Sequence, residues 1–301
     1  MSYLKRILFI IAVVAVAYNC KKKEAEPRET ILEGKATVIT DETLTPIIED
    51  QISVFESEYK AKIDLISKSE TEVVNALLDG SAKIAILSRK LSADELKVFN
   101  KKSLYPKITK FATDGIALIR NQKNNDTIVA LSDVLDFMRG KPVDGIKGLA
   151  FDNPNSSTVR YMCELAKIKT PPANVYSFHN NAEAIKYISE NDGIIGVIGL
   201  NWIDQPKPEM ESYLDRITVL EIKGNDGKYY APTQNNIAEG KYPLARELFV
   251  VNCQGFSGLG MGFASFVAGE RGQRIILKSG LVPATIPGRK ISIRNTVTKD
   301  K

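Results

Sequence analysis

The 301-residue sequence is poor in the residues that build metal centres and disulfide scaffolds, because it has one histidine, three cysteines and one tryptophan. A single histidine and cysteines without metal-ligand spacing predict no metal site and no cofactor. The chain also lacks a long basic run with interleaved aromatic residues, so nucleic acid is not an expected partner. It has no run of the roughly 20 apolar residues that a membrane-spanning helix needs.

The N-terminus has the pattern of an export signal. A charged start precedes an apolar run over residues 7–18, which is too short to span a bilayer. The segment 16–20 (VAYNC) resembles the cleavage box of bacterial lipoproteins, in which the cysteine becomes the lipidated first residue. We therefore predict a signal peptide over 1–19, lipid on Cys20 and a charged tether over 20–33. This places the protein on the periplasmic side of a bacterial membrane.

The bulk composition is that of an ordinary globular protein. The chain is 44% hydrophobic and 26% charged, which is enough to bury a large core in one large domain or two smaller ones. Its formal net charge is +5. Cys163 and Cys253 are expected to be buried as small hydrophobic residues, and the sequence leaves open whether they pair. His179 is expected at the surface, and Trp202 is expected to be a packing residue.

Strand-like and helix-like segments alternate along the rest of the chain. Strands are expected at short β-branched or apolar runs, and helices where apolar residues recur every three or four positions. This alternation favours an α/β fold in which a mostly parallel sheet is flanked by helices. Strands are expected over 36–39, 62–66, 83–87, 116–119, 148–151, 194–198 and 248–251, and helices from 46, from 92 and over 71–78, 131–138 and 182–189.

Asn155, Ser156, Ser157 and Thr158 place three hydroxyl residues in a row at the start of an expected helix. The first turn of a helix exposes backbone N–H groups without intrahelical partners, and the helix dipole adds positive charge there. Because the hydroxyl groups can donate outward, this loop predicts a cup for an oxyanion. The alternative is an ordinary cluster of helix-capping residues.

Three further loops, 40–45, 88–92 and 113–115, lie where ligands bind in open α/β sheets. In the second loop, Arg89 beside Ser88 offers two aligned donors to an oxyanion, or else is a solvated surface residue. In the third loop, Asp114 is expected to be half-buried. It either caps a turn or accepts the proton of hydrogen phosphate, which fully ionised sulfate lacks.

The first of these loops carries Thr40, Asp41, Glu42 and Thr43 ahead of the helix that Pro46 opens. These side chains could hold the same ligand as the other loops. Asp41 and Glu42 could instead cap the helix, and a capping role is expected for at least one of them. The sequence leaves open whether the two acids point inward.

The four loops, in this order, resemble the substrate-binding proteins of bacterial phosphate ABC transporters. The first loop is acidic where that family usually has Gly, Ser and Thr. An arginine often found before the family's Ser-Gly-Thr loop is replaced by Asp152 and Asn153, and Arg160 could substitute for it. The resemblance covers nearly the whole mature chain and rests on the segments 86–91 (ILSRKL), 113–117 (TDGIA), 155–158 (NSST), 195–199 (IGVIG), 241–246 (KYPLAR), 263–272 and 280–283.

The resemblance implies a type II periplasmic binding protein of two lobes. Each lobe would be a mostly parallel sheet flanked by helices, and two crossover strands would join the lobes as hinges. Lobe I would comprise residues 34–120 and 244–301, and lobe II residues 121–243. The hinges would lie near 119–121 and 242–247.

The resemblance also implies a ligand, a partner and a site. Inorganic phosphate would bind between the lobes and pass to an ABC permease, and the protein would be a monomer that is not an enzyme. One side of the ligand would be held by Thr40, Asp41, Glu42, Thr43, Ser88, Arg89 and Asp114, and the other side by Asn155, Ser156, Ser157 and Thr158.

Two rival interpretations come from other classes of protein. A binding or sensor lipoprotein on the same scaffold, with an altered or lost anion ligand, is favoured by the acidic first loop. A secreted hydrolase lacks support, because no nucleophile is paired with the single histidine and no Gly-x-Ser-x-Gly elbow is present.

Overall fold

The structure, a computed structural model, describes residues 29–288. The predicted signal peptide and Cys20 lie outside the described residues. Within residues 29–288, no helix has the length and apolar character needed to cross a membrane. The strands are β1 (Glu33–Asp41), β2 (Lys60–Lys68), β3 (Ile84–Leu87), β4 (Lys107–Asn121), β5 (Ile128–Val129), β6 (Gly148–Phe151), β7 (Val175–Ser177), β8 (Ile194–Gly199), β9 (Ile217–Val219), β10 (Glu221–Lys223), β11 (Tyr229–Tyr230), β12 (Ala245–Asn252) and β13 (Val282–Pro283). The helices are η1 (Glu42–Leu44), α2 (Thr45–Glu58), α3 (Glu70–Asp79), α4 (Ala93–Lys101), α5 (Leu131–Met138), α6 (Ser157–Ala166), α7 (Asn181–Glu190), α8 (Asn201–Asp204), η2 (Pro208–Met210), α9 (Glu211–Leu214), α10 (Gln234–Ala238), α11 (Leu259–Ala268) and α12 (Glu270–Lys278).

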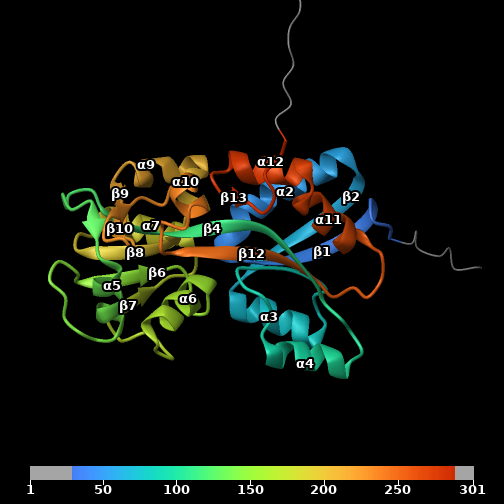
Figure 1. The fold of residues 1–301 in the computed structure, drawn as a ribbon, viewed down its shortest axis with the longest axis horizontal. Coiled ribbons are helices and arrows are strands. Elements are labelled where there is room, and N and C mark those ends of the chain that lie inside the picture. Colours follow the sequence, from blue (N-terminus) through green and yellow to red (C-terminus); the bar gives the residue numbers. More distant parts are fainter. Residues whose placement is uncertain (1–28, 289–301) are drawn as a thin grey trace, which may run out of the picture.

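One long sheet runs through both halves of the molecule. Within the described residues its path is β2-β1-β3-β12-β4-β8-β6-β7, with β9 and β13 also paired to β4. The pairs β1–β2, β1–β3, β6–β7 and β6–β8 are parallel, whereas β4 and β12 run antiparallel to their neighbours. β4 pairs with β12 up to Gly115 and with β8 from Ile116 onward. Figure 1 shows β4 and β12 side by side between the two halves.

Separate groups of buried apolar residues give each half its own core. In lobe I, on the right of Figure 1, α2 and α11 cover one face of the sheet around Phe55 and Phe263. Helices α3 and α4 cover the other face around Leu77 and Phe99. In lobe II, α5, α6 and α7 pack on β6 and β8, around residues such as Phe151. Complete burial of each such side chain stabilises the fold by about 1.5–3 kcal/mol.

Local sequence signals set the helix boundaries near the site. Helices α3 and α4 each begin with a capping box, in which Ser69 pairs with Glu72 and Ser92 with Glu95. Gly80 ends α3 with a φ of 89°, a left-handed conformation that glycine adopts without a steric penalty. These signals fix where α3 and α4 begin and where α3 ends, while the residue boundaries of the lobes remain predictions.

The structure corrects three sequence-based expectations about these elements. β4 begins at Lys107, well before the predicted start at 116, because its first half is partly exposed and does not read as an apolar run. The expected loop 113–115 is therefore wrong, since these residues lie inside β4 and pair with β12. The expectation that Asp41 or Glu42 caps the following helix is wrong. Asp41 precedes η1 without a side-chain capping bond, and α2 starts after the apolar Leu44.

The minor residues follow the expectations. Cys163 and Cys253 are buried, and neither forms a disulfide. His179 is exposed and Trp202 is buried.

Candidate functional site

Asp41 lies at the centre of a buried polar cluster where β1 ends between the lobes. Its side chain is completely buried, and within the described residues its Oδ2 atom has no hydrogen-bond partner. The pKa of this carboxyl is raised from 3.8 to about 7, mainly by burial and also by the charges of Glu70 and Asp152. The charge of Arg246 and the nearby hydroxyl of Ser157 oppose the rise. Asp41 is therefore a carboxyl group that changes protonation near neutral pH and still lacks a partner for one oxygen.

The predicted hydroxyl cup faces this cluster from the start of α6. Ser156 caps the helix by accepting from the amide of Val159 at 3.4 Å. The hydroxyls of Ser156 and Thr158 also donate to Oδ1 of Asp152, at 2.6 and 2.5 Å. The capping interpretation therefore describes Ser156. The oxyanion cup stays a prediction, and a carboxylate of the chain itself accepts the protons of two of its hydroxyls.

Asp114 and Arg246 form a buried ion pair beside Ser157. Two guanidinium nitrogens of Arg246 donate to Oδ2 of Asp114 at 3.0 and 3.1 Å, and the third donates to the hydroxyl of Ser157 at 2.7 Å. The side chains are 1% and 0% exposed, so the expectation that Asp114 is half-buried is wrong. Burial raises the pKa of Asp114, and Arg246 lowers it. The pairing holds the aspartate facing the cup rather than at the surface.

A second polar group lies around Glu70, whose side chain is 3% exposed. Arg89 from lobe I and Arg160 from lobe II both donate to its carboxylate, at 3.1 and 2.5 Å. The hydroxyl of Ser88 donates to the same carboxylate at 3.2 Å. Arg89 also makes two bonds of 2.8 Å with Glu95. Arg89 is thus neither a solvated surface residue nor a free cation.

The remaining residues of the first loop bind across to lobe II. Thr43 donates to Oδ2 of Asp152 at 2.8 Å, and Glu42 accepts from the amide of Asn181 at 2.7 Å. Burial and the charge of Asp152 raise the pKa of Glu42 to about 8. Thr40 is buried, and its hydroxyl bonds to the backbone oxygen of Asp41. Asp41 and Glu42, the two acids of this loop, therefore both point inward. This answers a question that the sequence left open.

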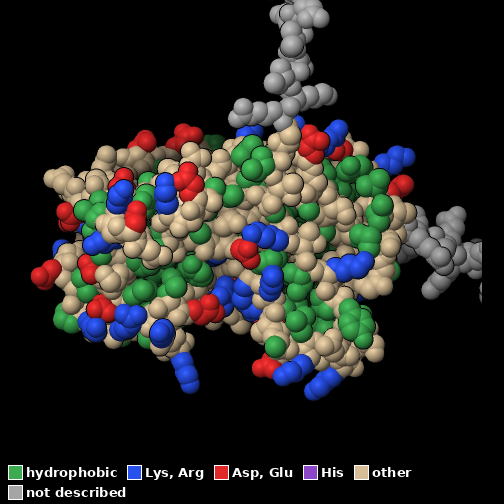
Figure 2. All heavy atoms as spheres, viewed as in Figure 1, with side chains coloured by type: hydrophobic (Ala, Val, Ile, Leu, Met, Phe, Trp, Pro, Cys, Tyr) green, Lys and Arg blue, Asp and Glu red, His purple; other side chains and the backbone are tan. Residues whose placement is uncertain are grey.

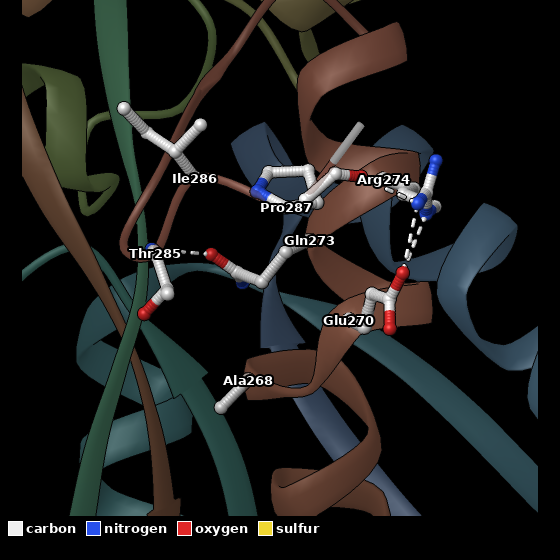
Figure 3. A pocket seen from close by; sticks show the side chains of 8 residues that line it. Ala268, Glu270, Gln273, Arg274, Thr285, Ile286 and Pro287 are labelled. Atoms are coloured by element: carbon white, nitrogen blue, oxygen red, sulfur yellow. Dashed lines mark hydrogen bonds and ion pairs between the residues drawn. The ribbon is translucent and has the colours of Figure 1, made fainter. Parts of the chain in front are cut away.

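A cleft of about 520 Å³ opens beside the Glu70 group, between α3 and α6. Figure 2 shows Lys and Arg side chains gathered where the two halves meet on this face. Asn155 lies at this cleft, and its backbone oxygen accepts from the amide of Thr71 across the lobes at 3.3 Å. A separate hollow of about 560 Å³ lies against α12 and the segment after β13, where Gln273 accepts from the amide of Thr285 (Figure 3). None of the predicted ligand residues lines that second hollow.

The structure thus divides the predicted site residues into two adjoining groups. Asp41, Thr43, Asp114 and the 156–158 loop meet around the buried centre, and Thr40 and Glu42 lie next to it. Ser88 and Arg89 belong to the Glu70 group, and Asn155 lies at the rim of the cleft. The two groups adjoin at Glu70, because its charge raises the pKa of Asp41.

Sequence reasoning missed four residues that the structure places in the site: Glu70, Asp152, Asn181 and Arg246. The sequence indicates Asp152 only as a departure from the family's arginine. Glu70 follows β2, at a fifth junction between a strand and a helix. The serine-rich sequence of this junction was the signal that could have identified it as part of the site. Arg246 ends the segment 241–246 that carried part of the family resemblance. Asn181 starts a helix, and nothing in its local sequence marks it as more than a capping residue.

The charge balance of the site is acidic. Glu70 pairs with Arg89 and Arg160, and Asp114 pairs with Arg246. The remaining three carboxyl groups near the centre, those of Asp41, Glu42 and Asp152, have no arginine bonded to them among the bonds found in residues 29–288. A ligand that brings protons suits this arrangement, because a fully ionised dianion would face net negative charge at low dielectric.

Comparison with known proteins gives matches over most of the chain. A family model described as a PBP superfamily domain matches residues 25–271. The phosphate-binding protein PstS of Staphylococcus epidermidis is 25% identical over 236 residues, which cover 73% of this chain and 69% of that protein.

Two solved structures share the fold. A putative phosphate ABC transporter substrate-binding protein from Clostridium perfringens, with bound phosphate, superposes with a TM-score of 0.69 at 19% identity, over 84% of this chain and 100% of that one. An ABC-type phosphate transport receptor from Vibrio cholerae superposes with a TM-score of 0.63 at 16% identity, over 82% of this chain and 99% of that one.

Proposed function

The chain belongs to the PBP superfamily, and from that premise we propose that it is an exported lipoprotein that captures hydrogen phosphate between its lobes and delivers it to an ABC permease. Relatives that are named as phosphate-binding proteins support this choice of ligand. The lipid would be carried by Cys20, outside the described residues.

The observation that supports the proposal most strongly is the unpartnered Oδ2 of Asp41 beside the cup. A buried acceptor without a donor costs about 1–3 kcal/mol, which a ligand O–H at this position would recover. Hydrogen phosphate has such an O–H group. Sulfate at neutral pH has none, so the same carboxylate would repel it.

The other ligand oxygens would accept hydrogen bonds from the start of α6 and from Arg246. The amides of the first helical turn have no intrahelical acceptors, and the dipole of the helix favours negative charge there. Ser157 already contacts both Arg246 and Asp41, so a ligand at this hydroxyl lies within reach of the cation and the acid. Asp114 holds the fork of Arg246 in place from behind.

Capture would involve closure of the lobes. Contacts such as Thr43 to Asp152, Asn181 to Glu42 and Arg160 to Glu70 join residues that are far apart in the sequence and lie on opposite lobes. Opening about β4 and β12 would break these bonds and expose the centre, and closing would remake them around the ligand.

A second candidate is supported by one specific observation. Arg89, Arg160 and Arg246 are each already bonded to a carboxylate of the chain itself. The site is then complete without an anion, as would suit a sensor or partner-binding lipoprotein on the same scaffold.

Equilibrium dialysis of the intact protein with radiolabelled phosphate separates these candidates. The proposed function predicts saturable binding of one phosphate per chain, which excess unlabelled sulfate does not displace. The absence of saturable phosphate binding at acidic and at neutral pH would reject phosphate capture and leave the second candidate.

A further inference from the structure

Two exposed aromatic side chains lie together at the end of lobe I, at a hollow that shares no lining residue with the ligand cleft. Tyr105 is 78% exposed in the loop between α4 and β4, and Phe256 is 50% exposed in the loop between β12 and α11. Both line one surface hollow of about 310 Å³, together with Lys107. The exposed Lys101 ends α4 just ahead of the same loop. We call Tyr105, Phe256, Lys101 and Lys107 the aromatic patch.

The described chain begins next to the aromatic patch. The carboxylate of Glu29 accepts hydrogen bonds from Gln254 and from the amide of Leu259, on either side of Phe256. A Cβ atom on Gly258 would lie 2.5 Å from both the Glu29 carboxylate and the Phe256 ring, so these two groups flank the same backbone position. Figure 1 shows the start of β1 and the loop after β12 at the same end of the molecule.

Chain length limits how far this end can lie from the predicted lipid. Only residues 21–28 separate Cys20 from Glu29. An extended chain advances at most 3.3–3.6 Å per residue, so the lipidated cysteine lies within roughly 30 Å of Glu29. A lipid on Cys20 therefore keeps this end of lobe I near the bilayer, and the charges of Lys21, Lys22 and Lys23 lie on the same short connection.

We propose that the aromatic patch contacts the headgroup region of an anionic phospholipid membrane and orients the anchored protein on it. Tyrosine and phenylalanine side chains are favoured at the membrane interface, and lysines are attracted to anionic lipid. The hollow at the patch shares no lining residue with the cleft between α3 and α6, so this contact leaves ligand entry open. The inference rests on the lipid anchor of the proposed function and is independent of the ligand.

Fluorescence quenching by brominated lipids tests the contact in the full-length lipidated protein. The variant F256W places an indole in the patch, and the matched control Y176W places one at a 45% exposed position on β7 of lobe II. Each is reconstituted in phosphatidylcholine–phosphatidylglycerol vesicles with and without bromine on the acyl chains. The buried Trp202 contributes the same background to both.

The proposal predicts that bromine lowers the added emission of F256W by about twofold or more and leaves that of Y176W nearly unchanged, because quenching needs contact with the lipid. Adding K101E and K107E to F256W should weaken the quenching. Equal quenching in the two variants, no quenching of F256W, or loss of the protein from vesicles on flotation would each overturn the proposal. The proposal would also be wrong if the indole of F256W were covered by a second copy of the protein and not by lipid.

Phosphate binding measured on the same vesicles keeps the two proposals apart. Quenching of F256W without phosphate binding would reject the proposed ligand and retain the membrane contact. Phosphate binding without quenching would retain the proposed ligand and reject the membrane contact.

Discussion

Replacing Asp41 with asparagine gives the sharpest prediction about the buried centre. The folded-state pKa of about 7 lies roughly three pH units above the ordinary 3.8 of an aspartate. At 1.36 kcal/mol per unit, ionised Asp41 costs the folded state about 4 kcal/mol. Because the folded pKa is raised, the folded protein keeps a proton that the unfolded chain has released. Stability is therefore lost as pH rises from about 4 to about 7.

The variant D41N removes this titration. An amide still leaves one buried polar atom without a partner, which offsets part of the gain by about 1–3 kcal/mol. We expect D41N to be more stable than the native protein by about 1–3 kcal/mol near pH 8, and less stable by about 1–3 kcal/mol near pH 4, where the native carboxyl is neutral and only the cost of the amide remains.

Urea denaturation at both pH values measures the difference, because the free energy of unfolding extrapolates linearly to water. The exposed Asp144 provides the control, since D144N changes the same charge at the surface. A stability change in D41N that is the same at both pH values, or a loss of stability near pH 8, would refute the assigned protonation of Asp41.

The remaining predictions concern the ion pairs and the close packing of the site. R246M should destabilise the protein by about 3–5 kcal/mol in urea denaturation, because it leaves Asp114 buried without its cation; a loss below about 1 kcal/mol would contradict the burial of the pair. R89A should weaken phosphate binding in equilibrium dialysis less than R246K does, since Arg89 bonds to Glu70 and Glu95 outside the centre; the reverse order would place Arg89 at the ligand. G199A should cost about 1–3 kcal/mol by thermal or urea unfolding, because its Cβ would lie 2.5 Å from Cγ2 of Thr43; unchanged stability would mean that the two segments are not in contact.

The sequence predicted the elements whose signals are local. The strand at 148–151 and the helix at 131–138 have the predicted bounds, because each is a compact apolar pattern between polar turns. The start of β4 could not be predicted in this way. Its first half depends on pairing with β12, which lies far along the chain.

The candidate site was predictable only as a set of loops. Asp41 and Ser157 stand where strands feed helices, and topology alone brings such loops to one edge. Asp114, which the sequence places in a loop, lies inside β4 instead. The hydrogen-bond and ion-pair partners of these residues depend on tertiary contacts, which no local sequence pattern predicts. The sequence predicts a half-buried Asp114, because no local pattern indicates its pairing with Arg246 across two antiparallel strands.

The two arginines of the Glu70 group show the same limit. A serine–arginine segment after a buried strand indicates an anion site in general. Whether Arg89 is free to bind an anion depends on Glu70 and Glu95, and these lie on two different helices. Arg160 reaches the same carboxylate from the other lobe, so its role could be assigned only once the lobes were placed together.

The central claim is that the cleft binds a protonated oxyanion with a buried carboxyl group as acceptor. Titration calorimetry with phosphate near pH 7.5, in two buffers of different ionisation enthalpy, tests it most directly, because the difference in heat counts the protons exchanged on binding. The account predicts one phosphate per chain, net release of less than one proton and no heat with sulfate, because Asp41 is partly protonated before binding and must be ionised to accept the ligand O–H. No heat with phosphate, net proton uptake, or equal binding of sulfate would contradict it.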